Sequence, residues 1–201
     1  MIALLDNGHD LAEAEAEIGC PVGQLLTPLT RYRLRDPDRP WAIDNGAFAN
    51  LDISALEALL RREDHHRDRC LFVTVPDIVA SAQRTAEVFE LWAPKLIGWK
   101  LAYACQDGQE NVRIPWNDIA AVFIGGSTNW KCSIHVEQII KTAKLFGKWV
   151  HIGRLNHPAR YEHFAGLGAD SCDGTGIARY SHMREAIRDR YHQTTLDLTC
   201  E

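Results

Sequence analysis

Short runs of apolar residues alternate along the chain with longer stretches in which apolar residues recur every three or four positions. The first pattern is typical of buried β-strands and the second of amphipathic α-helices. We predict strands near residues 2–5, 24–27, 41–44, 71–75, 97–104, 121–125, 149–153 and 169–173. We predict helices near residues 10–19, 52–63, 81–93, 133–146, 158–166 and 182–191. Because strands and helices alternate, we expect the strands to pair in parallel.

Short sequence signals mark several of the predicted boundaries. Ser54 and Glu57 have the spacing of a capping box at the start of a helix. Gly147 follows a predicted helix as its stop signal, and Pro158 suits the first turn of the next helix. Eight strands that alternate with helices predict an α/β fold, a small (β/α)8 TIM-type barrel that forms one domain over residues 1–201. An open, doubly wound sheet is the main alternative.

The composition narrows the classes of partner and site. The chain has 201 residues, 46% of them hydrophobic, which suits one packed core. A net charge of -5 and a pI near 6.0 exclude a protein that coats nucleic acid through bulk positive charge. The cysteines, at 20, 70, 105, 132, 172 and 200, have no CxxC spacing and predict neither disulfides nor a zinc ribbon. No targeting or membrane-spanning pattern is present, which predicts a cytoplasmic protein.

Polar residues and glycines gather where the predicted strands end. These clusters are "AIDNGAF" (42–48), "FVTVPD" (72–77), "AYACQDG" (102–108), "VFIGGSTNWK" (122–131), "VHIGRLN" (150–156) and "GADSCDGTG" (168–176). In a barrel the carboxyl ends of all strands face one mouth, so the clusters are expected to form a single site. Because strand side chains alternate between faces, only one of Asp170 and Asp173 should reach that site. Alternation alone does not decide between them; the assignment of the site to Asp173, with Asp170 structural, follows from a family resemblance.

Five of these motifs, in this order, carry a resemblance to a known family. The segments "IDNGAF", "VPD", "CQDG", "FIGGSTNWK" and "GADSCDGT" resemble the tRNA-guanine transglycosylase superfamily. The resemblance is greatest to its short phage and bacterial branch that inserts 7-deazaguanines into DNA, the DpdA-like proteins, and it covers about residues 41–180. It implies a (β/α)8 barrel that exchanges guanine in DNA for a free 7-deazaguanine base, such as the 7-cyano form, without metal or organic cofactor.

The resemblance also implies roles for individual residues. It makes Asp173 the nucleophile and Asp44 the general acid and base. It assigns recognition of the base to Asp77, Gln106, Gly125 and Gly126. Each also has a structural interpretation, since Asp44 lies in a "DNG" turn sequence, Asp77 can cap a helix, Asp173 can cap a turn and the two glycines can serve tight packing.

The chemistry of base exchange agrees with these roles. A carboxylate can capture an oxocarbenium-like centre at the anomeric carbon, as in retaining glycosidases. A second carboxyl with a raised pKa can protonate the leaving base and deprotonate the incoming one. The pairing edge of guanine needs an acceptor-only carboxylate, together with donors from an amide or the backbone.

Basic residues are candidates for contact with DNA. Arg31, Arg33 and Arg35 belong to "RYRLRDPDR" (31–39), which follows the second predicted strand and is expected on the mouth side of the barrel. Arg154 and Asn156 end the seventh predicted strand and are candidates for a phosphate contact, although Arg154 can equally pair with an acid. The run "RREDHHRDR" (61–69) ends a helix and is expected at the opposite end.

The C-terminal region predicts no regular metal site. The chain lacks the C-x-C-x-x-C zinc motif of the tRNA enzymes that it resembles, which favours DNA over tRNA as the substrate. Cys172, His182, His192 and Cys200 leave only an irregular metal site as an option. Three other functions stay open: a hydrolytic glycosylase that uses the same site, a non-catalytic barrel that binds nucleic acid or a base for a partner subunit, and a sugar-phosphate enzyme.

Overall fold

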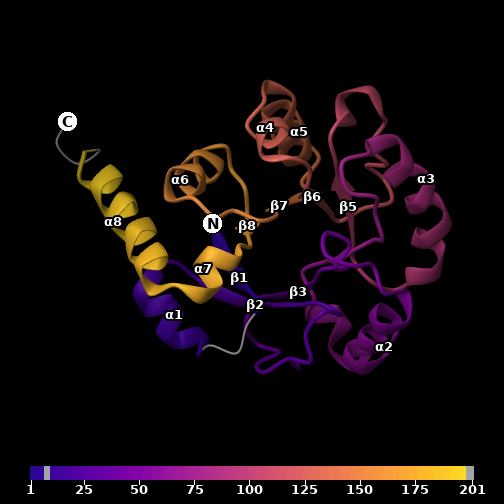
Figure 1. The fold of residues 1–201 in the computed structure, drawn as a ribbon, viewed down its shortest axis with the longest axis horizontal. Helices are drawn as coiled ribbons and strands as arrows, with labels where there is room; N and C mark the ends of the chain where they lie inside the picture. The colour runs from indigo at the N-terminus through magenta and orange to yellow at the C-terminus, as the bar shows by residue number, and fades with distance from the viewer. Residues whose placement is uncertain (7–9, 198–201) are drawn as a thin grey trace.

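Eight parallel strands form a closed barrel (Figure 1). The structure, a computed structural model, describes residues 1–6 and 10–197, with side chains to residue 190. The strands are β1 (Ile2–Leu5), β2 (Val22–Leu26), β3 (Trp41–Ile43), β4 (Val73–Thr74), β5 (Leu101–Cys105), β6 (Ala121–Ile124), β7 (Trp149–Ile152) and β8 (Ser171–Cys172). Each strand pairs with the next, and β8 pairs with β1 to close the sheet. The predicted (β/α)8 barrel is confirmed, and the open sheet is excluded.

Helices form a ring around the barrel (Figure 1). The α-helices are α1 (Leu11–Ile18), α2 (Ile53–Glu63), α3 (Ala82–Trp92), α4 (Thr128–Lys131), α5 (Ile134–Leu145), α6 (Pro158–Gly166), α7 (Thr175–Arg179) and α8 (Ser181–Asp197). Short 3-10 helices lie between some of them: η1 (Asp64–Arg69), η2 (Ala93–Leu96) and η3 (Gln109–Asn111). Within the residues described, no helix is long and apolar enough to cross a lipid bilayer.

Several element boundaries differ from the predicted ones. Residues 97–100 precede β5, because the chain turns at Gly98, whose φ is 90°, and the strand begins only at Leu101. β2 begins earlier than predicted, at Val22, while β4 and β8 are shorter than predicted. The predicted helix at 182–191 is longer in the structure, and the sequence pattern did not predict α7 before it.

Helix ends follow the predicted signals at some positions only. Pro158 is the first residue of α6, and Gly147 follows α5 with a φ of 65°, as predicted. The capping box that begins at Ser54 does not form. Asp52 caps α2 instead, because its carboxylate lies one turn before the free N–H groups and accepts a hydrogen bond from Ala55 N at 3.0 Å.

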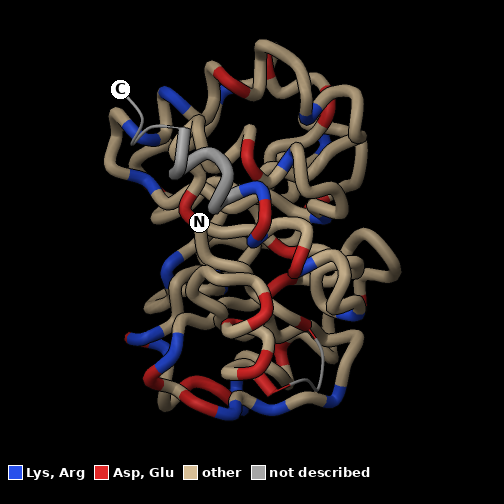
Figure 2. Tube along the Cα trace, turned by 90° about the vertical axis from the view of Figure 1, so that its left-hand side faces the viewer, with Lys and Arg blue, Asp and Glu red and all other residues tan. Residues whose placement is uncertain are grey.

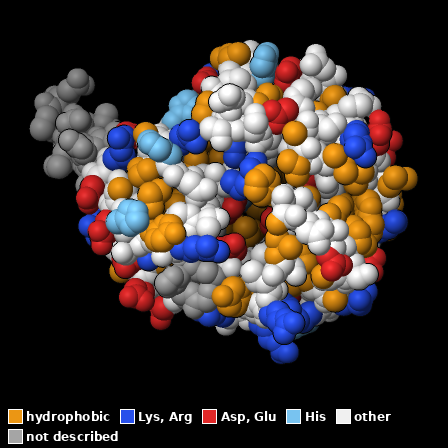
Figure 3. All heavy atoms as spheres, viewed as in Figure 1, with side chains coloured by type: hydrophobic (Ala, Val, Ile, Leu, Met, Phe, Trp, Pro, Cys, Tyr) orange, Lys and Arg blue, Asp and Glu red, His pale blue; other side chains and the backbone are white. Residues whose placement is uncertain are grey.

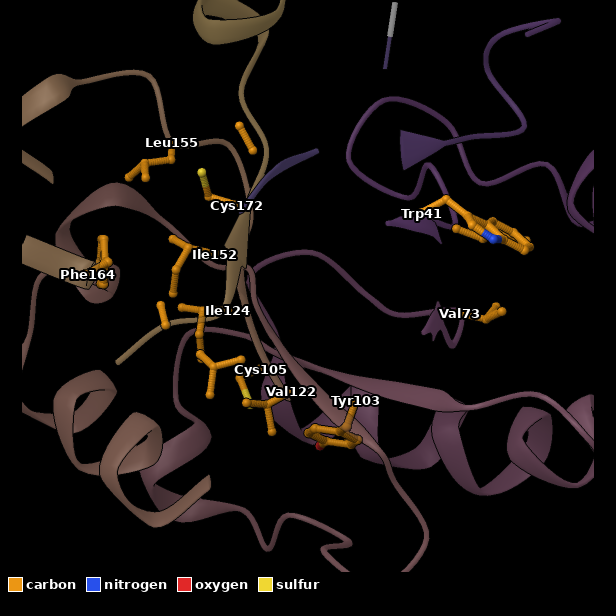
Figure 4. Close-up of a cluster of buried hydrophobic side chains, with 14 of the residues drawn as sticks. Trp41, Val73, Tyr103, Cys105, Val122, Ile124, Ile152, Leu155, Phe164 and Cys172 are labelled. Atoms are coloured by element: carbon orange, nitrogen blue, oxygen red, sulfur yellow. The ribbon is translucent and has the colours of Figure 1, made fainter. Parts of the chain in front are cut away.

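Strand residues alternate between the barrel interior and the layer under the helices. Outer side chains such as Trp41, Tyr103, Ile124 and Ile152 are fully buried in the larger hydrophobic cluster (Figure 4). The inner ones form a separate small cluster: Leu4, Leu25, Ala42, Phe72, Ala102 and Ala121. Each large buried side chain contributes about 1.5–3 kcal/mol to stability. Because this inner cluster fills the interior, the site forms at a barrel end.

The connection between β2 and β3 runs down the outside of the barrel without a helix in residues 27–40, all of which are described. Gln24, on the outer face of β2, holds this segment in place. Its amide N–H donates to Arg33 O at 2.8 Å, and its side-chain oxygen accepts from Arg35 N at 3.0 Å. A buried glutamine thus provides the hydrogen bonds that the extended backbone needs where a helix would otherwise pack.

The placement predicted for the two basic runs is wrong. Arg62, near the end of α2, donates a hydrogen bond to Tyr32 O at 2.9 Å, and Arg69 pairs with Asp38. The run 31–39 therefore descends the side of the barrel next to the run 61–69, and the two do not lie at opposite ends. The reason is the extended path of the β2–β3 connection, which must return from the mouth to the start of β3.

Candidate active site

Side chains that follow β3 to β8 converge on a pocket at the mouth, the end of the barrel where the strands finish. Its lining consists of Asp44, Asn45, Phe48, Asp77, Val79, Gln106, Phe123, Gly125, Arg154 and Asp173. We call this the mouth pocket; its empty space of about 390 Å³ is open to solvent. Figure 3 shows the hollow near the centre of this face, with acidic side chains inside and basic ones at its edge.

The mouth pocket brings together most of the predicted site residues. Asp173, Asp44, Asp77, Gln106, Gly125 and Arg154 line it. Gly126 lies directly behind, where its N–H donates to Gln106 Oε1 at 2.9 Å. The pocket lining does not include Arg31, Arg33, Arg35 or Asn156. Asn156 is exposed, and its side-chain oxygen accepts a hydrogen bond from Gly176 N at 2.7 Å at the start of α7.

Asp173 and Asp170 point to opposite sides of the sheet, as strand alternation predicts. Asp173 Oδ1 lies 3.0 Å from His151 Nε2 and accepts a hydrogen bond from Arg154 N at 3.0 Å. Asp170 pairs with Lys144 at 2.7 Å and accepts from Val150 N at 2.7 Å, away from the mouth pocket. The carboxylate of Asp173 is therefore fixed through one oxygen.

A chain of polar side chains continues from Asp173 into the barrel interior. His151 Nδ1 lies 2.9 Å from Ser171 Oγ, which accepts a hydrogen bond from Trp149 Nε1 at 2.8 Å. His151 and Ser171 are fully buried. Trp149, His151 and Ser171 were not predicted as site residues. The signal that could have found them is strand alternation: residues two positions apart face the same side, so Trp149 and His151 share one face of β7, and Ser171 shares the inner face of β8 with Asp173.

Asp44 has a strongly perturbed acidity. The side chain is half-buried at the end of β3, and its pKa is raised from 3.8 to about 7. Loss of hydration is the main cause, the nearby charges of Asp173 and Asp77 act in the same direction, and the Asn45 and Gly46 N–H groups oppose the shift. A carboxyl with such a pKa can both donate and accept a proton near neutral pH.

Asp77 lies at the centre of a buried amide network. Asn45 Nδ2 donates to Asp77 Oδ1 at 2.7 Å, and Gln106 Nε2 donates to Asp77 Oδ2 at 2.6 Å. Burial raises the pKa of Asp77, and the two amide donors oppose that shift. Asn45, which the sequence analysis treated only as part of a turn, is thus the residue that orients this carboxylate.

Two glycines allow the chain to approach Gln106 closely. A Cβ at Gly125 would lie 2.6 Å from Gln106 Nε2. Gly126 has a φ of 65°, and a Cβ there would lie 2.5 Å from the Trp130 ring. A larger residue at Gly125 would therefore displace the amide that contacts Asp77, and one at Gly126 would displace the Trp130 ring.

Arg154 forms part of the pocket rim. Its backbone has a φ of 57°, which is unusual for a residue other than glycine. The guanidinium donates to Gly126 O and lies 3.8 Å from the centre of the Phe48 ring, which is 62% exposed. The rim thus carries an exposed aromatic ring together with a cation.

A further carboxyl near Asp173 was not predicted. Asp6 follows β1, and its pKa is raised by burial and by the charge of Asp173, while Arg179 lowers it. Elsewhere the charges are mixed: Figure 2 shows Lys and Arg interspersed with Asp and Glu along the chain. At the pocket rim the cation is Arg154, which lies against the Phe48 ring.

The irregular C-terminal metal site has no support in the described residues, which contain no cluster of three or more side chains able to hold a metal ion. Cys172 is fully buried in the hydrophobic core. The side chain of His192 and residue Cys200 lie outside the part of the chain described.

Comparison with known proteins shows the fold. No protein-family model and no curated protein matches the chain. Phosphoribosyl anthranilate isomerase from Thermus thermophilus is 16% identical, with a TM-score of 0.52, over 96% of this chain and 98% of that one. The Amycolatopsis orientalis BexX/CysO complex contains a chain that is 15% identical, with a TM-score of 0.57, over 97% of this chain and 89% of that one. The likeness therefore extends over the whole barrel.

Proposed function

We propose that this protein exchanges guanine in DNA for a 7-deazaguanine base through a covalent aspartyl-nucleoside intermediate. One observation carries the proposal: Asp44, with a pKa of about 7, shares a pocket with Asp173, whose carboxylate is fixed by N–H groups on one oxygen. Transfer at an anomeric carbon with retention needs one carboxylate as the nucleophile and one carboxyl that exchanges a proton near neutral pH. The resemblance of five strand-end motifs to guanine transglycosylases agrees with this division.

In the first displacement, Asp173 Oδ2 attacks C1′ of the deoxyguanosine. The bond between C1′ and N9 breaks, and its electron pair leaves with guanine, which takes a proton from Asp44. Oδ1 keeps its hydrogen bond to Arg154 N, so that the second oxygen is free to react. The product is an ester between Asp173 and the sugar, with inverted configuration at C1′.

In the second displacement, a 7-deazaguanine occupies the place of guanine. Asp44, now a carboxylate, removes the proton from N9, and N9 attacks C1′ as the ester bond to Asp173 breaks. Two inversions restore the original configuration, which the modified nucleotide needs in order to pair in a duplex. Each cycle returns both aspartates to their starting protonation states.

The amide network supplies partners for the pairing edge of guanine. Asp77 is a buried acceptor whose oxygens each retain a lone pair for a base N–H. Gln106 Nε2 donates one hydrogen to Asp77, which leaves the second for the carbonyl of the base. Adenine presents an acceptor where guanine presents an N–H and is rejected, because Asp77 would face it without a hydrogen bond.

The pocket rim suits a nucleotide taken out of a duplex. Phe48 offers an exposed ring for stacking, and Arg154 offers a cation beside it. A chain of net charge -5 with mixed surface charge is suited to contact with a single extruded nucleotide and a few phosphates. These features support a polymer substrate over a free nucleoside.

The test incubates the purified protein with plasmid DNA and radiolabelled guanine, and measures label in the precipitated DNA. We expect incorporation by the parent protein and none by the Asp173→Asn variant. Abasic sites without incorporation would instead indicate a hydrolytic glycosylase, and DNA binding with neither product a non-catalytic barrel. A parallel reaction with tRNA distinguishes the two polymers.

A further inference from the structure

We infer that His151 is a positioning residue for Asp173, held in its neutral Nε2–H form by a hydrogen-bond chain from Trp149 through Ser171. This inference rests on the proposed function for its catalytic meaning, while the hydrogen-bond chain itself stands on geometry. The chain crosses the barrel interior and ends on the carboxylate that we propose as nucleophile.

The direction of each hydrogen bond follows from the first donor. The indole N–H of Trp149 can only donate, so Ser171 Oγ accepts at 2.8 Å. Among the described residues Ser171 Oγ has hydrogen-bond contacts only with Trp149 and His151, so we direct its hydroxyl hydrogen to His151 Nδ1 at 2.9 Å, with Nδ1 as the acceptor. The imidazole hydrogen is thereby assigned to Nε2, which faces Asp173 Oδ1 at 3.0 Å.

The surroundings of His151 restrict its ring to this orientation. The imidazole is fully buried, with the Phe72 ring centre at 5.1 Å and the Phe123 ring centre at 4.7 Å. Neither ring offers a competing hydrogen-bond partner to the imidazole nitrogens. In this apolar interior a hydrogen bond is stronger than in water, so the chain fixes the rotamer of Asp173.

A neutral partner suits a nucleophile that loses its charge during the reaction. When Asp173 becomes an ester, a buried cation beside it would be left unpaired, at a high energetic cost. A neutral N–H donor loses only part of one hydrogen bond at that step. The Arg154 guanidinium donates to Gly126 O, while the backbone N–H of Arg154 donates to Asp173. This residue therefore also contacts Asp173 through a neutral donor.

The first test is spectroscopic and needs no activity. Histidine ¹⁵N NMR of the full chain distinguishes the two neutral tautomers and the imidazolium, and the spectrum of His151→Gln identifies the His151 signal among the nine histidines. We expect the Nε2–H tautomer at neutral pH, and a change in its population in Ser171→Ala. An Nδ1–H tautomer or an imidazolium in the parent protein would overturn the inference.

The second test is kinetic and uses incorporation of labelled guanine into DNA. We expect His151→Leu to lower kcat about 100-fold through misplacement of Asp173, with the KM for the base unchanged. His151→Gln, which can supply an N–H at the same reach, should recover most of that loss. Equal loss in both variants, or a change confined to KM, would contradict a positioning role.

Two controls separate failure of the inference from other failures. Ser171→Ala replaces His151→Leu if that variant does not fold, as judged by thermal unfolding, and should also lower kcat. If the parent protein forms no adduct with DNA or tRNA, the proposed function fails, and the NMR result alone decides whether the chain sets the tautomer of His151.

Discussion

Three carboxyl groups share the mouth pocket, and each has a different environment. Asp173 is fixed through Oδ1, Asp44 is half-buried beside two acids, and Asp77 is held by two amides. The same side chain thus serves three purposes, because hydration and hydrogen-bond donors differ at each position. These differences lead to three predictions at the scale of single residues.

Asp173→Asn should abolish both base exchange and the covalent adduct with DNA. An amide oxygen is a poor nucleophile and presents no negative charge to the oxocarbenium-like centre. The adduct is measured as a mass-shifted DNA–protein species. Asp170→Asn, which changes an acid on the other side of the sheet, is the matched control and should retain exchange. The assignment fails if the adduct survives in the first variant or activity depends on the second.

Asp44→Asn should stabilise the protein at pH 8 more than at pH 5. The folded-state pKa of Asp44 is raised from 3.8 to about 7, so the folded chain binds an extra proton between these values. Stability contributed by protonated Asp44 is therefore lost as the pH rises through about 7. Urea unfolding at the two pH values measures the effect. An equal change in stability at both pH values would show that the folded-state pKa of Asp44 is not raised.

Asp77→Ala should weaken the preference for guanine over adenine. The buried donors of the base, and those of Asn45 and Gln106, would lose an acceptor at a cost of about 1–3 kcal/mol. Competition of unlabelled adenine and guanine against labelled guanine measures this preference in the variant and the parent. Unchanged competition would remove Asp77 from base recognition.

These carboxyls could be predicted from the sequence, whereas the residues that contact Asp173 could not, and the reason is physical. Asp44, Asp77 and Gln106 stand where strands end, and a barrel brings all such positions to one mouth. The contact between His151 and Ser171 depends instead on the register of β7 against β8, in which these two residues are paired. Register between strands cannot be derived from the alternation within each strand.

At the scale of elements, the β2–β3 connection depends on one side chain. Gln24 binds the backbone at Arg33 and Arg35 and replaces the packing that a helix would provide. The run 31–39 was predicted on the mouth side of the barrel, and its descent along the barrel wall was not predicted. The two partners lie nine and eleven positions from Gln24, and a local pattern does not contain such a contact.

Gln24→Ala should lower the free energy of unfolding by about 1–3 kcal/mol, because it leaves two backbone groups without partners. Chemical denaturation measures the loss. Gln83→Ala is the control, since Gln83 makes only an exposed contact with Glu87 within α3 and its loss should change stability by about 0.5 kcal/mol or less. Similar values for both variants would show that the segment does not depend on the Gln24 side chain.

At the scale of the whole molecule, Lys and Arg alternate with Asp and Glu along the described chain, and the net charge is -5 (Figure 2). Any polyanion that binds must then be held by local cations, which neutralise few phosphates at once. The fold and one common mouth follow from the alternating pattern of the sequence. The side-by-side path of the runs 31–39 and 61–69 cannot be predicted from that pattern, because it results from a β2–β3 connection without a helix.

DNA binding should depend weakly on salt, with a slope of log affinity against log salt of about -3, corresponding to three or four phosphates. Arg31, in the run 31–39 that follows β2, should contribute to this slope, so that Arg31→Gln makes it shallower. Arg67, next to Gly98 before the start of β5, is the control. Fluorescence anisotropy with a labelled duplex measures both. A greater loss in Arg67→Gln would place DNA away from the mouth.

The pairing of β8 with β1 also sets the order in which the site is completed. Ile2 pairs with Ser171, so the barrel closes through a contact between residues about 170 positions apart. Contacts of such sequence separation form late in folding, because a long loop must close first. During synthesis the strands that carry Asp44, Asp77 and Gln106 emerge before β8. A partly made chain can thus hold Asp44, Asp77 and Gln106 without Asp173, and the complete mouth pocket forms only when the barrel has closed.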